Sequence, residues 1–584
     1  LYYNTTGNGN TANGANTLVF NTIGVANTAT GAGALFKNIT GNNNSAYGTS
    51  SLYNNTTGSN NTANGYQALF GNTTGSYNVA NGGQALIANT TGIANTAIGY
   101  RALFKNTTGN GNTANGDSTL FSNITGHGNT ATGYRALTSN TTGNRNTATG
   151  YLALQNNTTG TFNTATGFQV LSNNTTGMAN TANGSGALFA NTTGKENTAN
   201  GYRTLAANTT GEANTANGYH ALLANTTGSS NTATGNLSLS TNTTGYFNTA
   251  NGVSALLNNT TGYRNTATGA SALAANTTGK ENTAGGVGAL LANEVGNANT
   301  AHGFESLSAN TAGSSNTATG YRALLLNTTG SSNTATGENS LQNNTIGIRN
   351  IATGSFAIAS NTTGSQNTAG GYQALYNNTA GDGNTALGFL AGMINTVGTN
   401  NTFVGNNANA SFANLTNATA IGNGATVNAP NKVRIGNAAV TVIEGQVAYS
   451  FPSDRRLKEN IVYTDRLGLN FITKLQTVSY SYISDKTHVR HDGFIAQDIE
   501  AVMKELKVPF SGLKKSQEDM YSLAYSDFVM PLVNAAKELK QQNDEQQTEI
   551  DDLKKQLAVL AQRMNAVEMA KGDTKTADEA TGKR

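Results

Sequence analysis

The residues with the clearest chemical potential lie at an internal boundary of the chain, where Lys458 follows Ser453 by five positions. A serine hydroxyl is a weak nucleophile until a base removes its proton, and a desolvated, neutral lysine can be that base. Both residue types are common, so this spacing alone does not establish a nucleophilic site.

Three sequence motifs follow one another from this boundary onward. The first is Ser453-Asp454-x-x-Leu457-Lys458-x-Asn460-Ile461, the second is Leu-Gln-Thr-Val-Ser-Tyr-Ser-Tyr at 475–482, and the third is Gly-Phe-Ile-Ala-Gln-Asp at 493–498. Their order and spacing resemble the endosialidase-type intramolecular chaperone domain of phage tail spikes and fibres. The resemblance covers roughly residues 453–570.

This resemblance implies a trimerising chaperone that helps the upstream part to fold and then cuts itself off. Carried over residue by residue, Ser453 is the nucleophile, Lys458 is its base, and the bond between Pro452 and Ser453 is cut. The implied enzyme is an autocatalytic Ser-Lys peptidase that acts once, on itself, without a cofactor or a metal. The same motifs supply three candidate supporting residues: Asp454, Asn460 and Gln497.

The elements expected to position this site form a small α+β domain and a coiled coil. Residues 453–525 alternate helical and strand-like pieces, and the third motif indicates a strand or turn that leads into an amphipathic helix. His488 and His491 lie beside it and are expected to be ordinary surface histidines. Heptads from Leu532 to Val567 predict a coiled coil over 526–570, with polar layers at Asn543 and Gln546. Residues 571–584 are predicted to be a disordered tail.

Residues 1–400 repeat a seventeen-residue unit, Asn-Thr-Thr-Gly-x-x-Asn-Thr-Ala-x-Gly-x-x-Ala-Leu-x-x, in 24 copies without an insertion. This period predicts a parallel β-solenoid or β-roll in which each copy is one coil that packs on its neighbours. A disordered low-complexity tract is the alternative, since sequences rich in Asn, Thr and Gly are often disordered. Disorder gives no reason, however, for the leucine that recurs at position fifteen from Leu18 to Leu341.

Within each repeat, glycines at positions four and eleven (Gly58 and Gly65, for example) indicate turns that use positive φ. The pieces Asn-Thr-Ala-x and x-x-Ala-Leu are both expected to form short strands, with Asn and Thr ladders along the axis. One Leu and two Ala per coil make a thin interior, which predicts further burial between chains. The repeats resemble those in the heads of trimeric autotransporter adhesins, and this resemblance implies a trimeric rod.

Residues 401–452 keep echoes of the repeat and are more apolar, so short strands are expected there as a neck that closes the solenoid. The chain contains no Cys, which excludes disulfides and thiolate metal sites. Basic and acidic residues number 13 and 9 in residues 1–452 and 20 and 21 in residues 453–584, a balance that argues against nucleic-acid binding. No apolar run is long enough to predict a membrane span. Because the chain begins in mid-repeat, an N-terminal portion is expected to be missing.

The sequence therefore predicts a fibrous, homotrimeric tail-fibre-like protein or surface adhesin. It would lie outside the cell, on a virion or a bacterial surface, and would bind a host or cell-surface glycan or protein. Tyrosines at repeat position twelve, such as Tyr66, could stack on sugars or could simply cover a turn. The alternative function is a passive structural filament with a terminal domain that does not cut. Thr-x-Thr arrays such as Thr130 and Thr132 would make that filament a candidate ice binder.

Overall fold

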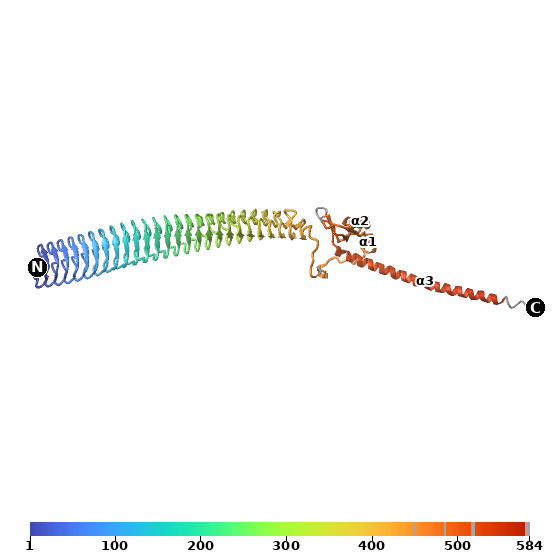
Figure 1. The fold of residues 1–584 in the computed structure, drawn as a ribbon, viewed down its shortest axis with the longest axis horizontal. Helices are drawn as coiled ribbons and strands as arrows, with labels where there is room; N and C mark the ends of the chain where they lie inside the picture. The colour runs from blue at the N-terminus through green and yellow to red at the C-terminus, as the bar shows by residue number, and fades with distance from the viewer. Residues whose placement is uncertain (448–449, 484–485, 516–519, 578–584) are drawn as a thin grey trace, which may run out of the picture. The chain divides into compact units, whose positions relative to one another are not determined.

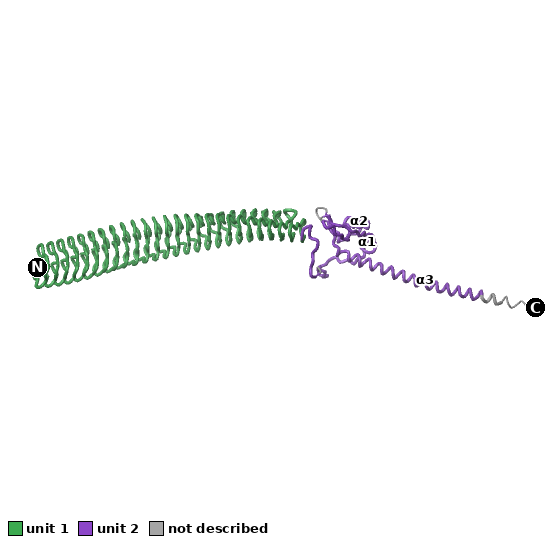
Figure 2. Tube along the Cα trace, viewed as in Figure 1, with its two compact units in different colours: residues 1–435 green, residues 436–584 purple. Residues whose placement is uncertain are grey.

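The computed structural model describes residues 1–447, 450–483, 486–515 and 520–577 (Figure 1). The chain divides into two compact units, residues 1–435 and residues 436–584 (Figure 2). The first unit is a stack of coils, and the second contains the described helices. The predicted boundary at residue 400 therefore lies within the stack.

The first unit is a parallel β-solenoid, as the seventeen-residue period predicted. Its strands run from β1 (Thr11–Asn13) to β24 (Thr402–Val404), each three residues long and each starting 17 residues after the one before. Neighbouring strands pair in parallel with identical repeat positions opposite each other, as Thr11 pairs with Thr28. The stack is continuous because the repeat length never changes.

Each coil contains one strand rather than the two that the sequence predicted. The Asn-Thr-Ala-x piece forms the strand, whereas the x-x-Ala-Leu piece is a turn in which Leu69 has φ 52° and Gln67 has φ 55°. A left-handed conformation costs a non-glycine residue about 1–2 kcal/mol. Full burial of the leucine side chain contributes a stabilising free energy of about the same size. A leucine can therefore occupy this turn, although its residue type alone suggests a strand.

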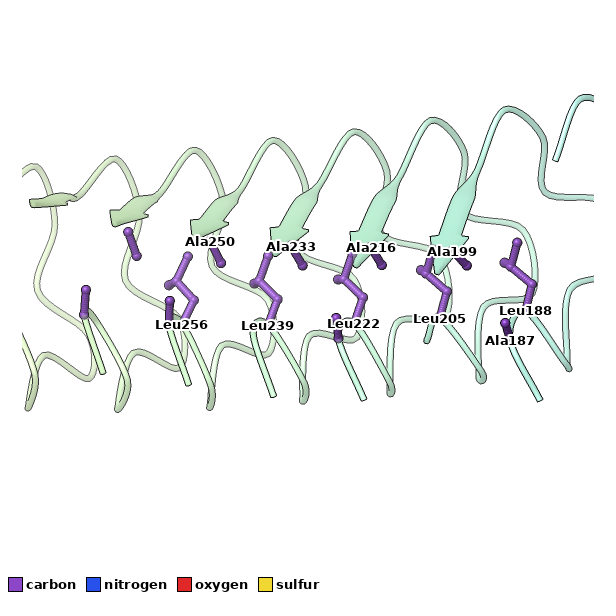
Figure 3. Close-up of a cluster of buried hydrophobic side chains, with 14 of the residues drawn as sticks. Ala187, Leu188, Ala199, Leu205, Ala216, Leu222, Ala233, Leu239, Ala250 and Leu256 are labelled. Carbon is purple, nitrogen blue, oxygen red and sulfur yellow. The ribbon is translucent and has the colours of Figure 1, made fainter. Parts of the chain in front are cut away.

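The apolar core consists of columns that run along the solenoid: the strand alanines, the leucines at position fifteen and, in most coils, the alanines directly before those leucines (Figure 3). The strand alanines, such as Ala199 and Ala216, face the leucines of the opposite limb, such as Leu205 and Leu222, and all four are fully buried. The Leu column that the sequence assigned to the core is confirmed.

Two asparagine ladders share this interior and make it less thin than expected. At position one, Asn38 Nδ2 donates to Asn21 Oδ1 at 2.7 Å and to the carbonyl of Gly41 at 2.9 Å. At position seven, Asn61 donates through both N and Nδ2 to Asn44 Oδ1. These asparagines are completely buried and hydrogen-bonded, so they close the coils without exposing polar groups to an apolar core.

The two glycines of each coil serve different purposes. Gly65, at position eleven, has φ 132° and needs the freedom of glycine, as predicted. The prediction of positive φ is wrong for position four, because Gly58 does not adopt it. A Cβ on Gly58 would instead overlap the carbonyl oxygen of Gly75 and Asn55 Oδ1. Position four therefore requires glycine because a neighbouring coil approaches closely.

The solenoid continues through much of the predicted neck. β26 (Thr419–Ile421) pairs with β24 and with β28 (Val433–Ile435), the last strand of the large sheet. β25 (Asn409–Ala410) and β27 (Thr426–Val427) form a second, two-stranded parallel sheet. Phe403 takes the place of the strand alanine and is fully buried. A larger apolar residue therefore fills the core where the leucine column has ended.

Among its described residues, the second unit contains short helices, two antiparallel strand pairs and one long helix. Phe471, Ile499, Phe510 and Phe528 form its buried core. The elements before the long helix are η1 (Arg455–Leu457), α1 (Leu469–Lys474), β29 (Val478–Tyr480) paired with β30 (His491–Gly493), α2 (Ala496–Leu506), β31 (Leu513–Lys515) paired with β32 (Tyr521–Leu523), and η2 (Tyr525–Phe528).

The long helix α3 (Val529–Ala577) contains the predicted heptads. Its first turns have two distinct faces: Ala535 is buried, whereas Leu532 and Leu539 of the heptad seam are about half exposed. α3 also extends past residue 571, so the first residues of the predicted tail are helical, and residues 578–584 lie outside the described residues. No helix of the described ranges is long and apolar enough to cross a membrane.

Candidate functional site

The structure brings the two predicted catalytic side chains into contact. Lys458 Nζ lies 2.7 Å from Ser453 Oγ, close enough for a proton to pass between them. Pro452 directly precedes the serine, so the hydroxyl belongs to the residue that follows the proposed scissile bond. Both side chains are exposed in this single chain. The pair therefore has hydrogen-bonding geometry at an exposed position of the chain.

A single turn of 3-10 helix, η1, accounts for this contact across five residues. Asp454 caps the turn by accepting from the backbone N–H of Arg456 at 2.8 Å, and Lys458 N–H donates to the Arg455 carbonyl at 3.1 Å. The chain bends back over this turn, so the side chains on either side of it converge. Local sequence is thus sufficient to bring Ser453 and Lys458 together.

The three candidate supporting residues take different positions. The Asp454 carboxylate bonds the Arg456 guanidinium, with an Oδ2–Nη2 distance of 2.7 Å, and this bond holds the pKa of Asp454 below its usual range. Asp454 thus stabilises the turn, and no contact with Lys458 is recorded for it among the described residues. Asn460 has φ 52°, a left-handed conformation that asparagine tolerates well, and turns the chain after the pair.

Gln497 is the second residue of α2, and its side chain is exposed. Within the described ranges, no hydrogen bond joins it or Asn460 to Ser453 or Lys458. His491 packs beside two tyrosine rings, with centroids 6.0 Å from Tyr480 and 5.3 Å from Tyr482. His491 therefore belongs to the β29–β30 pair and His488 precedes it, while the Ser-Lys contact spans η1.

The sequence segment that contains this geometry has known relatives. Residues 453–507 match the family model described as chaperone of endosialidase. The matched segment of the chaperone of endosialidase begins at the serine of the pair and ends with Lys507, directly after α2. This confirms the predicted resemblance, for a C-terminal segment that the β-solenoid precedes. No curated protein sequence matches the chain.

The core of the second unit explains why the chaperone-of-endosialidase motifs have their residue types. Phe494 of the third motif stacks on Phe528 of η2 with centroids 5.1 Å apart, and its backbone N–H donates to the Tyr525 hydroxyl at 3.0 Å. Tyr480 of the second motif shares a hydrogen bond with Tyr482, which raises the pKa of Tyr480 to about 12. These aromatic residues support the fold, and the sequence did not indicate which of them would meet.

Sequence reasoning missed one residue that links the chaperone-of-endosialidase segment to α3. Glu538 accepts a 2.8 Å hydrogen bond from the backbone N–H of Leu469, the first residue of α1. A carboxylate at that position satisfies an unpaired N–H and complements the helix dipole. The residue before α1 is Gly468, which has no side chain to cap the helix, and this absence was the only sequence signal. The contact ties the third turn of α3 to the start of α1.

Proposed function

We propose that this chain is a homotrimeric, tail-fibre-like or surface-adhesive fibre whose C-terminal chaperone aligns three chains and is then released by self-cleavage. The observation that carries the proposal is the 2.7 Å contact between Lys458 and Ser453 at the first residue of the chaperone match, C-terminal to a long solenoid. A fibre made of nearly identical coils needs such an aligning element. Slipping one chain by one coil against another would change few contacts, so the rod alone defines register weakly.

The exposed seam of α3 supports the trimer. Leu553, Leu557 and Leu560 are between 56% and 69% exposed, although they occupy successive core positions of the heptad pattern. An isolated helix has no reason to hold a continuous apolar stripe in water, whereas three parallel helices would bury it. The number three comes from the resemblance to the chaperone family, because the seam residues do not distinguish a trimer from a dimer.

Charges beside the seam favour parallel helices in register. With the leucines at core positions, Glu549 and Lys554 are five residues apart at the g and e positions, and so are Arg563 and Glu568. In a parallel coiled coil, a g residue faces the e residue five positions later on the next helix. Both pairs combine opposite charges. Antiparallel packing or a shift by one heptad would separate these partners.

The cleavage reaction is proposed as an N-to-O acyl shift followed by hydrolysis. Ser453 Oγ attacks the carbonyl carbon of Pro452 while Lys458 takes the hydroxyl proton, and the proton passes to the departing Ser453 nitrogen as the amide bond breaks. Water then hydrolyses the ester, giving a Pro452 carboxylate and restoring the serine hydroxyl. Both side chains are exposed here, so burial against the other two chains would supply the desolvation that makes the lysine a base.

Gel electrophoresis and mass spectrometry of the purified protein test this proposal. The wild type should give one fragment that ends at Pro452 and another that begins at Ser453. Ser453→Ala and Lys458→Ala should each give a single uncut chain that still forms trimers, since these exposed side chains hold no core contact. Lys486→Ala is the matched control and should cut normally. A wild type that never splits, or a Ser453→Ala chain that splits at this bond, would refute the proposal.

The proposed location is outside the cell, on a virion or a bacterial surface. The asparagines of the Asn-Thr-Thr tetrads are glycosylation sequons, yet their side-chain amides are buried in the ladders, as for Asn38 and Asn55. A glycan on such an amide would prevent the coils from stacking. This supports synthesis in a pathway that does not add these glycans, as in bacteria and their viruses.

An ice-binding filament is the second candidate, and the register of the strands favours it. β8 (Thr130–Thr132), β9 (Thr147–Thr149) and β10 (Thr164–Thr166) present their outer threonines in two parallel columns. Such a flat, regular array of hydroxyl and methyl groups can order water. Thermal hysteresis of the wild type, lost in Thr149→Tyr, would support this function, and its absence would exclude it.

A further inference from the structure

One side of the solenoid carries a ladder of exposed aromatic rings at repeat position twelve. Tyr134 and Tyr151 stack with centroids 5.4 Å apart, and Tyr151 and Phe168 stack at 5.3 Å. Parallel rings at these separations cannot lie side by side in one plane, so their faces overlap. Where consecutive coils carry rings, the ring faces are therefore occupied, and the predicted sugar stacking has no free face within such a run.

The ladder is interrupted at Gly83, which lies one coil from Tyr66 and one coil from Tyr100. Two coils separate the flanking rings, a distance of about 9.6 Å at the usual strand spacing. The rings are 55% and 49% exposed. The space between the Tyr66 and Tyr100 rings is therefore about one ring thickness wider than the space between rings on consecutive coils. Because both rings are exposed, this space faces the solvent.

The backbone does not require glycine at position 83. Gly82, its neighbour, has φ 145°, and a Cβ there would meet the backbone of Gly99, whereas Gly83 has no positive φ. A Cβ on Gly83 would lie 3.5 Å from the Tyr100 ring and would touch nothing else within 4 Å except another atom of that ring. An ordinary side chain would fit, so the effect of the glycine is to leave the gap open.

Polar groups line one side of the gap. Arg101 Nε donates to Gln84 Oε1 at 2.9 Å, and Gln84 Nε2 donates to Gln67 Oε1 at 3.4 Å. The Arg101 guanidinium lies 4.9 Å from the centroid of the Tyr100 ring. Its Nη groups are left to donate to a further acceptor, and no ion pair with an acidic side chain is recorded for Arg101 anywhere in residues 1–447.

Among the other arginine–tyrosine pairs of the rod, Arg135 lies over Tyr134 and, like Arg101, forms no ion pair within residues 1–447, but the gap beside it holds Asp117. Arg322 lies over Tyr321 in the same way, but its guanidinium is neutralised by Glu305 at 2.8 Å. Two further gaps lie between aromatic neighbours at position twelve, and they hold Asp117 and Ser185, so each is partly filled by a side chain. The Gly83 gap combines the exposed ring of Tyr66 with the Arg101 guanidinium, which lies over the Tyr100 ring and forms no ion pair within residues 1–447.

The charge of this part of the rod has the sign that an acidic ligand requires. Residues 1–194 carry five basic side chains and one acidic one. A pyranose ring offers apolar C–H faces to the aromatic rings and a polar rim of hydroxyl groups to the amides. A carboxylate on that rim would form a charge-assisted bond with the guanidinium. The basic residues are Lys37, Arg101, Lys105, Arg135 and Arg145, and the acidic residue is Asp117.

We propose that the gap at Gly83, between Tyr66 and Tyr100 and beside Arg101, binds a uronic-acid-type pyranose of an acidic glycan. The sugar ring packs on Tyr66 within the gap, and its carboxylate pairs with Arg101, whose guanidinium lies over Tyr100. The inference rests on the proposed adhesive role of the rod and is independent of cleavage at Pro452–Ser453.

Ligand-observed saturation-transfer NMR on the full chain tests the site, with methyl glucuronide and methyl glucoside as probes. The wild type should bind the glucuronide at least about tenfold more tightly than the neutral glucoside, the factor expected for one charge-assisted hydrogen bond. Gly83→Tyr completes the ring ladder and should abolish binding without disturbing the fold. Asn236→Tyr adds a ring at the same repeat position next to Tyr219 and should leave binding unchanged.

Arginine variants separate the two parts of the site. Arg101→Gln should lower glucuronide affinity about tenfold, to the level of the glucoside, while Arg322→Gln, which alters the neutralised pair, should have no effect. Unchanged glucuronide binding in Gly83→Tyr would overturn the inference, as would equal binding of both sugars by the wild type. No response to either sugar would also overturn it, and would leave self-cleavage to be judged separately from the gel pattern.

Discussion

Removing one buried asparagine should open the solenoid locally, and Asn248 offers the sharpest test. It occupies position seven, directly before β15 (Thr249–Asn251), and is fully buried. Its Oδ1 accepts from Asn265 N at 3.0 Å and from Asn265 Nδ2 at 3.2 Å, and its Nδ2 donates to the Gly262 carbonyl at 2.8 Å. Asn248→Ala deletes these three hydrogen bonds at once.

The size of the effect follows from which partners are left unpaired. Asn265 Nδ2 keeps a bond to the Gly279 carbonyl and the Gly262 carbonyl keeps a bond from Asn259, whereas the buried Asn265 N–H has no other recorded acceptor. An orphaned buried donor costs about 1–3 kcal/mol and each other lost bond about 1 kcal/mol, so we expect about 3 kcal/mol or more. That corresponds to about a hundredfold more frequent opening.

Hydrogen exchange measured by mass spectrometry should detect this opening coil by coil. In Asn248→Ala, amides of the coils around residues 231–265 should exchange about a hundredfold faster, while distant coils remain protected because each coil contacts only its neighbours. Asn251→Ala, in the same coil, is the control. Asn251 is exposed and has no recorded side-chain hydrogen bond, so its loss should change exchange by about twofold or less. Equal exchange in the two variants would refute the ladder argument.

Three further outcomes are expected. Leu205→Asp should disrupt several neighbouring coils in the same exchange experiment, because it places a charge in a fully buried column, whereas Lys195→Glu should do little, since its ion pair with Glu212 is exposed. Leu553→Asp should convert trimers to monomers in sedimentation if α3 forms the coiled coil. The lowered pKa of Asp454 means that its contribution to the turn persists below the usual aspartate range and is lost only as pH falls through the lowered value; a carboxyl NMR titration with an ordinary midpoint would contradict this.

The sequence by itself determined the architecture of the rod and the location of the candidate site. An uninterrupted period of seventeen residues restricts the possible architectures to a stack of equal coils. The leucine that recurs at position fifteen indicates an interior that all the coils share. The Ser453–Lys458 pair could also be predicted from the sequence, because the single capped turn η1 between the two residues brings their side chains together. Each of these features depends on contacts that are either local or identical in every repeat. Such contacts produce a pattern of residue types that can be recognised in the sequence.

Only the tertiary structure decided how each coil closes and what lies between the coils. The left-handed leucine turns, the close approach at Gly58 and the complete pairing of the buried asparagines depend on atoms one coil away, whose positions no single repeat reveals. The link from Glu538 to Leu469 joins residues 69 positions apart, beyond any local pattern. Residue types restrict which contacts are favourable, but only the folded chain selects which distant groups come within hydrogen-bonding distance.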